Sequence, residues 1–184
     1  MAKEIELKIL DVDKRETMSR LRKFGAKRIG TLDFKRVIFF VKKSSDAAVW
    51  LRLRTDGKRH TLTLKEQYGS GLSQTNEYET EVKDFREAAR ILCRSFNRFV
   101  YEENKRIEYS LDGIEITLDK WPYLPWLVEI EGKTEKEVMG MYKRLGIKGR
   151  PVGNINASKA YSLYGLDFER IAGRNRKKIL KLIE

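Results

Sequence analysis

The chain has 184 residues, 41% of them hydrophobic, which is enough for one domain with a core of its own. Its net charge of +12 favours anionic partners such as nucleotides, polyphosphate or nucleic acid. The single cysteine excludes an internal disulfide, and no apolar run approaches the ~18–20 residues of a membrane span. The sequence MAKEIELK at the start lacks the apolar segment of a signal peptide, so we expect a cytoplasmic protein with no membrane partner.

The first predicted strand, residues 4–8, alternates between an apolar face and a charged face that carries Glu4, Glu6 and Lys8. A helix is predicted over 11–25, where Asp13 is the N-cap and Gly25 ends it. A long strand is predicted over 27–43. Three strands with short connections follow at 49–55, 60–66 and 76–82, and Asp56-Gly57 marks a hairpin turn.

A second helix is predicted over 84–95 and a strand over 96–110. Two more strands, 114–119 and 127–131, flank a loop rich in tryptophan and proline, which we interpret as a packed turn rather than an adenine-binding shelf. Helices are predicted at 134–145, 157–164 and 168–184, and the last one is strongly basic. A solvated face is the usual role of such a helix, although its apolar residues suit docking on the sheet or on a second subunit.

Eight strands arranged as hairpins predict an α+β protein built on an antiparallel barrel or tunnel. Each strand has one apolar and one charged face, and the helices also carry apolar stripes. We therefore expect the apolar faces to point outward, under the helices, and the charged faces to line the interior. The acids expected inside are Glu4, Glu6, Glu79, Glu81, Glu115, Asp119, Glu129 and Glu131. The bases expected inside are Lys8, Arg52, Arg54, Lys65 and Arg106.

Such an interior suits a polyphosphate together with a metal ion. Arg52, Arg54 and Lys65 lie on adjacent strands and make a phosphate cradle. The carboxylates offer oxygen ligands, which Mg²⁺ and Mn²⁺ prefer. Zinc is not expected, because the chain has one histidine and one cysteine. A glycine-rich loop of Walker type is absent from the sequence.

The pattern Glu4-x-Glu6-x-Lys8 resembles the ExExK signature of the CYTH superfamily, the triphosphate tunnel metalloenzymes. The remaining charged pairs follow in that family's order, from Arg52-x-Arg54 to Glu129-x-Glu131. The resemblance runs from residue 4 to about 161. It implies an eight-stranded antiparallel tunnel that binds a small-molecule triphosphate with Mg²⁺ or Mn²⁺.

The resemblance also implies residue roles. The expected metal ligands are Glu4, Glu6, Glu79, Glu81, Asp119, Glu129 and Glu131. The expected triphosphate ligands are Lys8, Arg52, Arg54, Lys65, Arg106 and Lys159. The residues expected to act in the reaction are Lys8, Glu4, Glu6 and Asp119. We expect the tunnel domain to span residues 1–166 and the basic C-terminal helix residues 167–184.

Two departures from the family pattern bear on function. Members often carry Lys-x-Arg before the seventh strand, whereas this chain has Asn104 and Arg106. Some class IV adenylyl cyclases carry a His-Phe pair before ExExK, which this chain lacks. Lys159 and Tyr161 fall where members often have a Lys-x-Tyr or Ser-Tyr element over the tunnel mouth.

Three functions are compatible with these residues. The first is a metal-dependent hydrolase of tripolyphosphate, thiamine triphosphate or a nucleoside triphosphate. The second is a class IV adenylyl cyclase, in which the same cradle makes cyclic AMP and pyrophosphate from ATP. The third is a non-catalytic module that binds polyphosphate or RNA. We favour the hydrolase, expect no nucleic acid partner, and leave open a homodimer.

Overall fold

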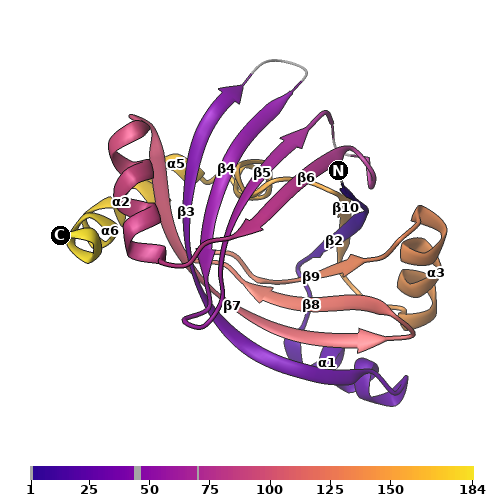
Figure 1. The fold of residues 1–184 in the computed structure, drawn as a ribbon. Helices are drawn as coiled ribbons and strands as arrows, with labels where there is room; N and C mark the ends of the chain where they lie inside the picture. The colour runs from indigo at the N-terminus through magenta and orange to yellow at the C-terminus, as the bar shows by residue number, and fades with distance from the viewer. Residues whose placement is uncertain (1, 44–46, 70) are drawn as a thin grey trace.

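The computed structural model describes residues 2–43, 47–69 and 71–184, without the side chains of residues 2–4 and 43. The described part of the chain forms one curled antiparallel sheet of ten strands, and most of its helices cover the outer face (Figure 1). The strands are β1 (Ala2–Glu4), β2 (Glu6–Leu10), β3 (Lys27–Lys43), β4 (Ala48–Thr55), β5 (His60–Gln67), β6 (Thr75–Glu81), β7 (Phe99–Leu111), β8 (Ile114–Lys120), β9 (Trp126–Glu131) and β10 (Arg150–Gly153). The helices are α1 (Lys14–Lys23), α2 (Phe85–Ser95), α3 (Glu135–Leu145), α4 (Ala157–Ser162), α5 (Phe168–Gly173) and α6 (Arg176–Ile183).

The sheet curls into a half-barrel because its two ends are joined by the chain itself. The strand order is β1-β6-β5-β4-β3-β7-β8-β9-β2-β10, so β1 and β2 lie near opposite ends of the sheet. Only Ile5 separates them in sequence, which brings the two ends together. Its carbonyl accepts a hydrogen bond from the amide of Gly132 at 3.1 Å, and the amide of Glu6 donates to the carbonyl of Leu72 at 3.1 Å.

The strand expected over residues 4–8 is therefore two strands. The segment pairs with β6 before Ile5 and with β9 after it, so one run of alternating residues serves both ends of the sheet. The other strand that the sequence analysis did not predict is β10, which pairs with β2 at the sheet edge. These two differences account for ten strands instead of eight.

The apolar faces point outward, as expected. One core cluster joins Leu7 and Ile9 of β2 to Leu21 of α1 and Val138 of α3. A second joins the outer face of β3 and β7 to α2 and α6, with Phe39 at its centre. Figure 1 shows α1 and α3 outside the wall made by β2, β8 and β9, and α2 and α6 outside β3. These four helices cover the outer face of the sheet.

A third core cluster lies on the inner face. There Leu10, Ile38 and Val100 pack with Ala160 of α4 and Phe168 of α5. These strand residues share their face with Lys8, Arg36 and Glu102 because side chains alternate along a strand. The inner face is therefore apolar at one end and polar in the cavity beside it.

The predicted helix ends are confirmed where capping residues occur. The side chains of Asp13, Asp84 and Thr134 each accept a hydrogen bond from the backbone three residues on, and Gly146 ends α3 in a left-handed conformation. The expected continuous helix over 168–184 is wrong: the structure has α5 and α6 there, with Arg174 and Asn175 between them. Both pieces contact β7.

Among the residues described, no helix has both the length and the apolar character needed to cross a bilayer.

Substitution of Gly149, which directly precedes β10, tests how closely β10 packs against β2. A Cβ built there would lie 2.5 Å from the carbonyl oxygen of Leu10 and 2.7 Å from Cγ2 of Ile9. We expect Gly149→Ala to lower the free energy of unfolding by about 2–3 kcal/mol, measured by urea denaturation, because backbone has to move. Gly113, in a hairpin with open space around its Cα, is the control. Gly113→Ala should lower the free energy of unfolding by only about 1 kcal/mol, the cost of a left-handed backbone conformation. Equal losses in the two variants would show that the close contact at Gly149 does not matter for stability.

Candidate active site

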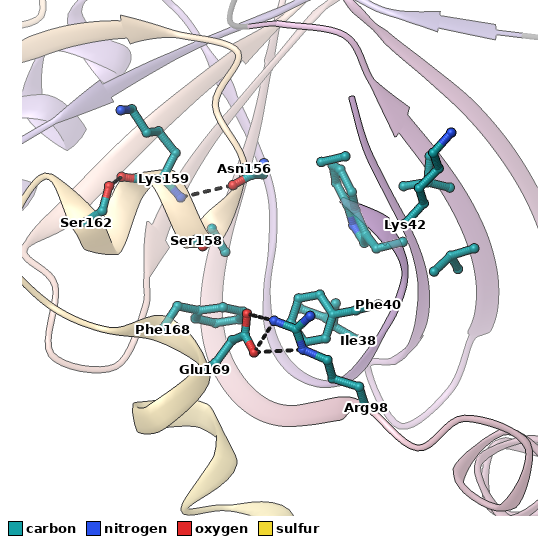
Figure 2. A pocket seen from close by; sticks show the side chains of 15 residues that line it. Ile38, Phe40, Lys42, Arg98, Asn156, Ser158, Lys159, Ser162, Phe168 and Glu169 are labelled. Atoms are coloured by element: carbon teal, nitrogen blue, oxygen red, sulfur yellow. Dashed lines mark hydrogen bonds and ion pairs between the residues drawn. The ribbon is translucent and has the colours of Figure 1, made fainter. Parts of the chain in front are cut away.

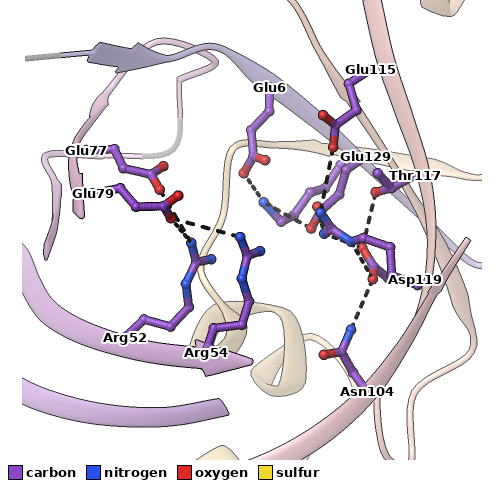
Figure 3. Close-up of polar contacts among 12 residues, drawn as sticks. Glu6, Arg52, Arg54, Glu77, Glu79, Asn104, Glu115, Thr117, Asp119 and Glu129 are labelled. Carbon is purple, nitrogen blue, oxygen red and sulfur yellow. Dashed lines mark hydrogen bonds and ion pairs between the residues drawn. The ribbon is translucent and has the colours of Figure 1, made fainter. Parts of the chain in front are cut away.

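A polar cavity of about 300 Å³ lies on the inner face of the curled sheet. Six basic and seven acidic side chains line it. The bases are Lys8, Arg36, Arg52, Arg54, Lys65 and Arg106, and the acids are Glu6, Glu77, Glu79, Glu102, Glu115, Glu129 and Glu131. Figure 3 shows two groups of these charges on opposite sides of the cavity, one with Arg52, Arg54, Glu77 and Glu79 and the other with Glu6, Glu115 and Glu129. We call the charged residues of β2, β8 and β9, together with Arg106 of β7, the acidic wall, and those of β4–β6 the basic wall.

Strand register builds the acidic wall. Glu6 of β2 is opposite Glu131 of β9, which is in turn opposite Glu115 of β8. Two residues further along, Lys8 is opposite Glu129. Because side chains alternate across a strand, these residues all point to the same face of the sheet. Three carboxylates therefore lie in one row across three neighbouring strands.

The centre of the acidic wall is a buried network around Arg106 of β7. Its Nε donates to Oδ1 of Asp119 at 3.0 Å and its Nη2 to Oδ2 at 2.6 Å, and it also pairs with Glu129. Asp119 is fully buried and further accepts hydrogen bonds from the Asn104 amide at 3.1 Å and from the Thr117 hydroxyl at 3.2 Å. Every strand from β7 to β9 thus contributes a member of the network.

Charge and burial act in opposite directions on the two carboxyls of this network. Burial alone would raise the pKa of Glu129, but the charges of Lys8 and Arg106 outweigh it and hold this pKa well below its usual range. Burial raises the pKa of Asp119 and outweighs the opposing effect of Arg106. Lys8 pairs with Glu6 and lies 3.5 Å from Oε1 of Glu129, so it links β2 to the same network.

The basic wall is built in the same way. The guanidinium of Arg52 lies 3.4 Å from Oε1 of Glu77 and 3.7 Å from Oε2 of Glu79, and that of Arg54 lies 3.9 Å from Oε2 of Glu79. Lys65 Nζ is 3.2 Å from Oε2 of Glu77. Burial, followed by the like charge of Arg52, lowers the pKa of Arg54 to about 9. The two contacts with Glu79 exceed hydrogen-bond length, so the guanidiniums keep capacity for another anion.

Most residues expected in the interior line this cavity, but three of the expected site residues, Asp119, Glu81 and Lys159, do not. Asp119 is fully buried in the network around Arg106. Glu81 has a side chain that is 67% exposed and accepts a hydrogen bond from Arg59 at 2.6 Å. Lys159 is exposed and lines a neighbouring pocket instead. Glu4 lies outside the residues whose side chains are described. Glu79 lines the cavity in the basic wall, across from Glu129 and Asp119, so the expected metal ligands do not form one cluster (Figure 3).

The sequence analysis missed several lining residues, above all Arg36 of β3 and Glu102 of β7. For Glu102 the sequence did contain a signal. Glu102 lies four residues before Arg106 on one strand, and strand alternation puts both on the same face. Arg36 directly precedes the apolar run Val37–Val41. This run resembles a core strand, so the sequence gives no indication that the Arg36 side chain points into the cavity. Its position opposite Arg54 follows only from the pairing of β3 with β4.

The donor chemistry of the acidic wall fits a hard divalent cation. Carboxylate oxygens from Glu6, Glu115, Glu129 and Glu131 face one cavity, and Mg²⁺ and Mn²⁺ favour oxygen ligands. No group of three or more acids, histidines or cysteines is gathered closely enough to hold a metal within the described part of the chain. The network explains this, because Glu6 and Glu129 are paired with Lys8 and Arg106. A cation would therefore have to take over carboxylates that now face bases.

A more apolar pocket of about 450 Å³ adjoins the cavity. The two share Ile38, Trp50, Asn156 and Ala157 in their linings. Figure 2 shows Phe40 and Ile38 beside the Arg98–Glu169 ion pair, with Phe168 of α5 next to it and Lys159 extending away. The pocket has room for an organic group next to the charged cavity.

Comparisons with known proteins agree with this fold. The model of the CYTH domain matches residues 2–140. A Pyrococcus horikoshii protein, PH1012, is 24% identical over 79% of this chain and 91% of its own, with a TM-score of 0.65. A candidate adenylate cyclase from Vibrio parahaemolyticus is 12% identical over 87% and 98% of the two chains, with a TM-score of 0.64.

A candidate adenylyl cyclase from Hippeastrum, described as having a dominant triphosphatase activity, is 18% identical over 90% of this chain and 97% of its own, with a TM-score of 0.57. A comparison with proteins of curated function finds no match.

The buried network makes a prediction about stability. Asp119→Asn removes a fully buried charge that faces Arg106, and we expect it to lower the free energy of unfolding by about 3–5 kcal/mol. Asp112→Asn is the matched control, since Asp112 pairs with Arg144 on the surface, where such pairs contribute about 1 kcal/mol or less. Urea denaturation at neutral pH measures both. A small loss in Asp119→Asn would show that the network does not hold β7–β9 together.

Proposed function

The chain belongs to the CYTH domain family, whose members are metal-dependent enzymes that act on triphosphates, and on that premise we propose that it is a hydrolase of triphosphate substrates that uses Mg²⁺ or Mn²⁺. The substrate is inorganic tripolyphosphate, thiamine triphosphate or a nucleoside triphosphate. The observation that carries this proposal is a cavity in which buried hydrogen-bond donors lack partners.

Those donors belong to residues that line the cavity. Within the described residues, no hydrogen-bond partner is found for Nε and Nη2 of Arg36, Nε of Arg52, Nε1 of Trp121 or Nδ2 of Asn154. Leaving a buried donor unpaired costs free energy. A triphosphate brings many acceptor oxygens and negative charge, and it would satisfy these groups. An apolar ligand or a cation alone would not.

The residue roles follow from the two walls. Arg52, Arg54 and Lys65 hold the phosphate chain from the basic wall, and Lys8 and Arg106 reach it from the acidic wall. Glu6, Glu129 and Glu131 hold the divalent cation, together with Glu4. When bound, this cation would neutralise phosphate oxygens and lower the pKa of the attacking water. Attack of water on the terminal phosphorus breaks the bridging P–O bond and releases phosphate and the remaining diphosphate. Asp119 keeps Arg106 aimed at the cavity.

Charge balance supports joint binding of substrate and metal. The cavity already holds nearly equal numbers of acids and bases, most of them paired. A triphosphate attracts the bases away from their carboxylates, and the freed carboxylates then need a cation. Binding of the triphosphate therefore frees carboxylates for the metal, and binding of the metal frees bases for the triphosphate.

A class IV adenylyl cyclase is the second candidate, favoured by the adjoining apolar pocket. That pocket would hold the organic part of ATP while the triphosphate occupies the cavity, and the attacking group would be the ribose 3′-hydroxyl. The relatives from Vibrio parahaemolyticus and Hippeastrum, described as candidate cyclases, add the same alternative. Their identity to this chain is too low to decide between the reactions.

Product analysis tests the proposal and separates the candidates. Purified protein is given tripolyphosphate or ATP, with Mg²⁺ or Mn²⁺, and phosphate, pyrophosphate and cyclic AMP are measured. We expect phosphate from tripolyphosphate and no cyclic AMP from ATP. Cyclic AMP with equal pyrophosphate would replace the hydrolase by the cyclase. Binding of tripolyphosphate without any product would leave a polyphosphate-binding module.

The acidic wall gives a further prediction. Glu131→Gln keeps the size of the side chain but removes a carboxylate from the row that faces the cavity. We expect metal-dependent turnover to fall at least 100-fold, with far-UV circular dichroism unchanged. Glu87→Gln, on the exposed face of α2, is the control and should keep full activity. Turnover near that of the unaltered protein would remove Glu131 from the metal ligands.

A further inference from the structure

Arg36 is a buried arginine whose hydrogen-bonding groups are left unused. Its side chain is 7% exposed and lines the cavity. Nε and Nη2 have no hydrogen-bond partner within the described ranges. Nη1 lies 3.7 Å from Oε1 of Glu102, which is too far for a hydrogen bond. Both carboxylate oxygens of Glu102 likewise lack hydrogen-bond partners among these residues. The two side chains therefore do not form a self-sufficient structural salt bridge.

Strand register places Arg36 between the two walls. It is opposite Arg54 on β4 and opposite Glu102 on β7. The strand β3 thus continues the basic wall toward Arg106, which lies further along β7. None of the basic residues that the sequence analysis expected to bind triphosphate lies on β3. Arg36 therefore adds a basic residue from a further strand.

Three guanidiniums lie close to the ring of Phe34. Its centroid lies 5.4 Å from Cζ of Arg36, 4.7 Å from Cζ of Arg54 and 6.0 Å from Cζ of Arg106. Phe34 is itself buried, and its π-face partly offsets the loss of water around these cations. Asp119 and Glu129 hold Arg106 by short contacts. By contrast, Arg54 lies 3.9 Å from the carboxylate of Glu79, and Arg36 lies 3.7 Å from that of Glu102.

Two poorly paired, buried guanidiniums side by side repel each other. Burial lowers the pKa of Arg36, and the opposing charge of Glu102 does not fully restore it. Water could fill hydrogen bonds here, but it would not neutralise the charge. A phosphoryl group does both, because its oxygens match the planar fork of an arginine. Trp121 Nε1, which also lacks a partner among the described residues, supplies one more donor from the lining.

We propose that Arg36 is a further phosphate-binding residue of this site, that with Arg54 and Arg106 around Phe34 it holds one phosphoryl group of the substrate, and that Glu102 balances its charge until the phosphoryl group binds. This inference rests on the proposed function, because it assumes that a triphosphate enters the cavity. It goes beyond that function in assigning a phosphate contact to β3.

The test measures binding of inorganic tripolyphosphate by calorimetry, with and without Mg²⁺. Arg36→Gln alone would leave Glu102 buried without its cation, so the main variant is Arg36→Gln combined with Glu102→Gln. We expect this double variant to bind roughly 10- to 100-fold more weakly. Glu102→Gln alone should bind at least as tightly as the unaltered protein, since Arg36 then has no competing carboxylate. Affinity at the level of the unaltered protein in the double variant would overturn the proposal.

Arg36→Lys covers the case in which the double variant does not fold. Lysine keeps a positive charge beside Glu102 but loses the planar fork, so we expect a normal melting temperature and affinity at least fivefold weaker. Unchanged affinity in this variant would also overturn the proposal. Arg144→Gln is the control, because Arg144 likewise pairs with a carboxylate and contacts a phenylalanine ring, but lies outside the cavity. Its affinity should not change.

Arg54→Gln separates this inference from the proposed function. If tripolyphosphate does not bind the unaltered protein, or if Arg54→Gln binds it equally well, the triphosphate site itself is wrong. If Arg54→Gln weakens binding while the Arg36 variants do not, only the role of Arg36 is wrong.

Discussion

Buried charges inside a curled sheet need partners, and the partners available here lie on neighbouring strands. Arg106 of β7 holds Asp119 of β8 and Glu129 of β9, and Lys8 of β2 extends the chain of contacts. A shift of one residue in any of these strands would turn its charges toward the helices and leave the others unpaired. The network therefore fixes the register of β2, β7, β8 and β9. The same register arranges the carboxylates of the candidate active site.

Alternation along single strands correctly predicted many of the side chains that line the interior. Glu6, Lys8, Arg52 and Arg54 face the cavity because the period of a strand is local and does not depend on the rest of the chain. The pairing of walls could not be predicted in this way. Glu79 lies across the cavity from Glu129 because the strand order puts five strands between them. That separation depends on contacts between segments far apart in sequence.

Alternation also says nothing about where a cavity ends. Glu81 continues the inward pattern of β6, yet it lies beyond the cavity and pairs with Arg59. The break at Ile5 has a similar origin, since a strand changes neighbours there only because the sheet closes on itself. Arg36 shows the opposite error. Its position beside an apolar run makes it look like part of a core strand, whereas the pairing of β3 with β4 and β7 gives it two charged neighbours.

The acidic and basic walls together determine which ions can bind in the cavity. With both walls present, Arg36 and Arg52 are held near carboxylates, yet some of their buried N–H donors find no hydrogen-bond partner within the described residues. An anion entering alone would compete with those carboxylates and leave them buried without cations. A cation entering alone would do the same to the bases. An anion and a cation that enter together would exchange partners without leaving any charge unpaired, and this is the physical ground on which we propose a metal-bound polyanion as the ligand.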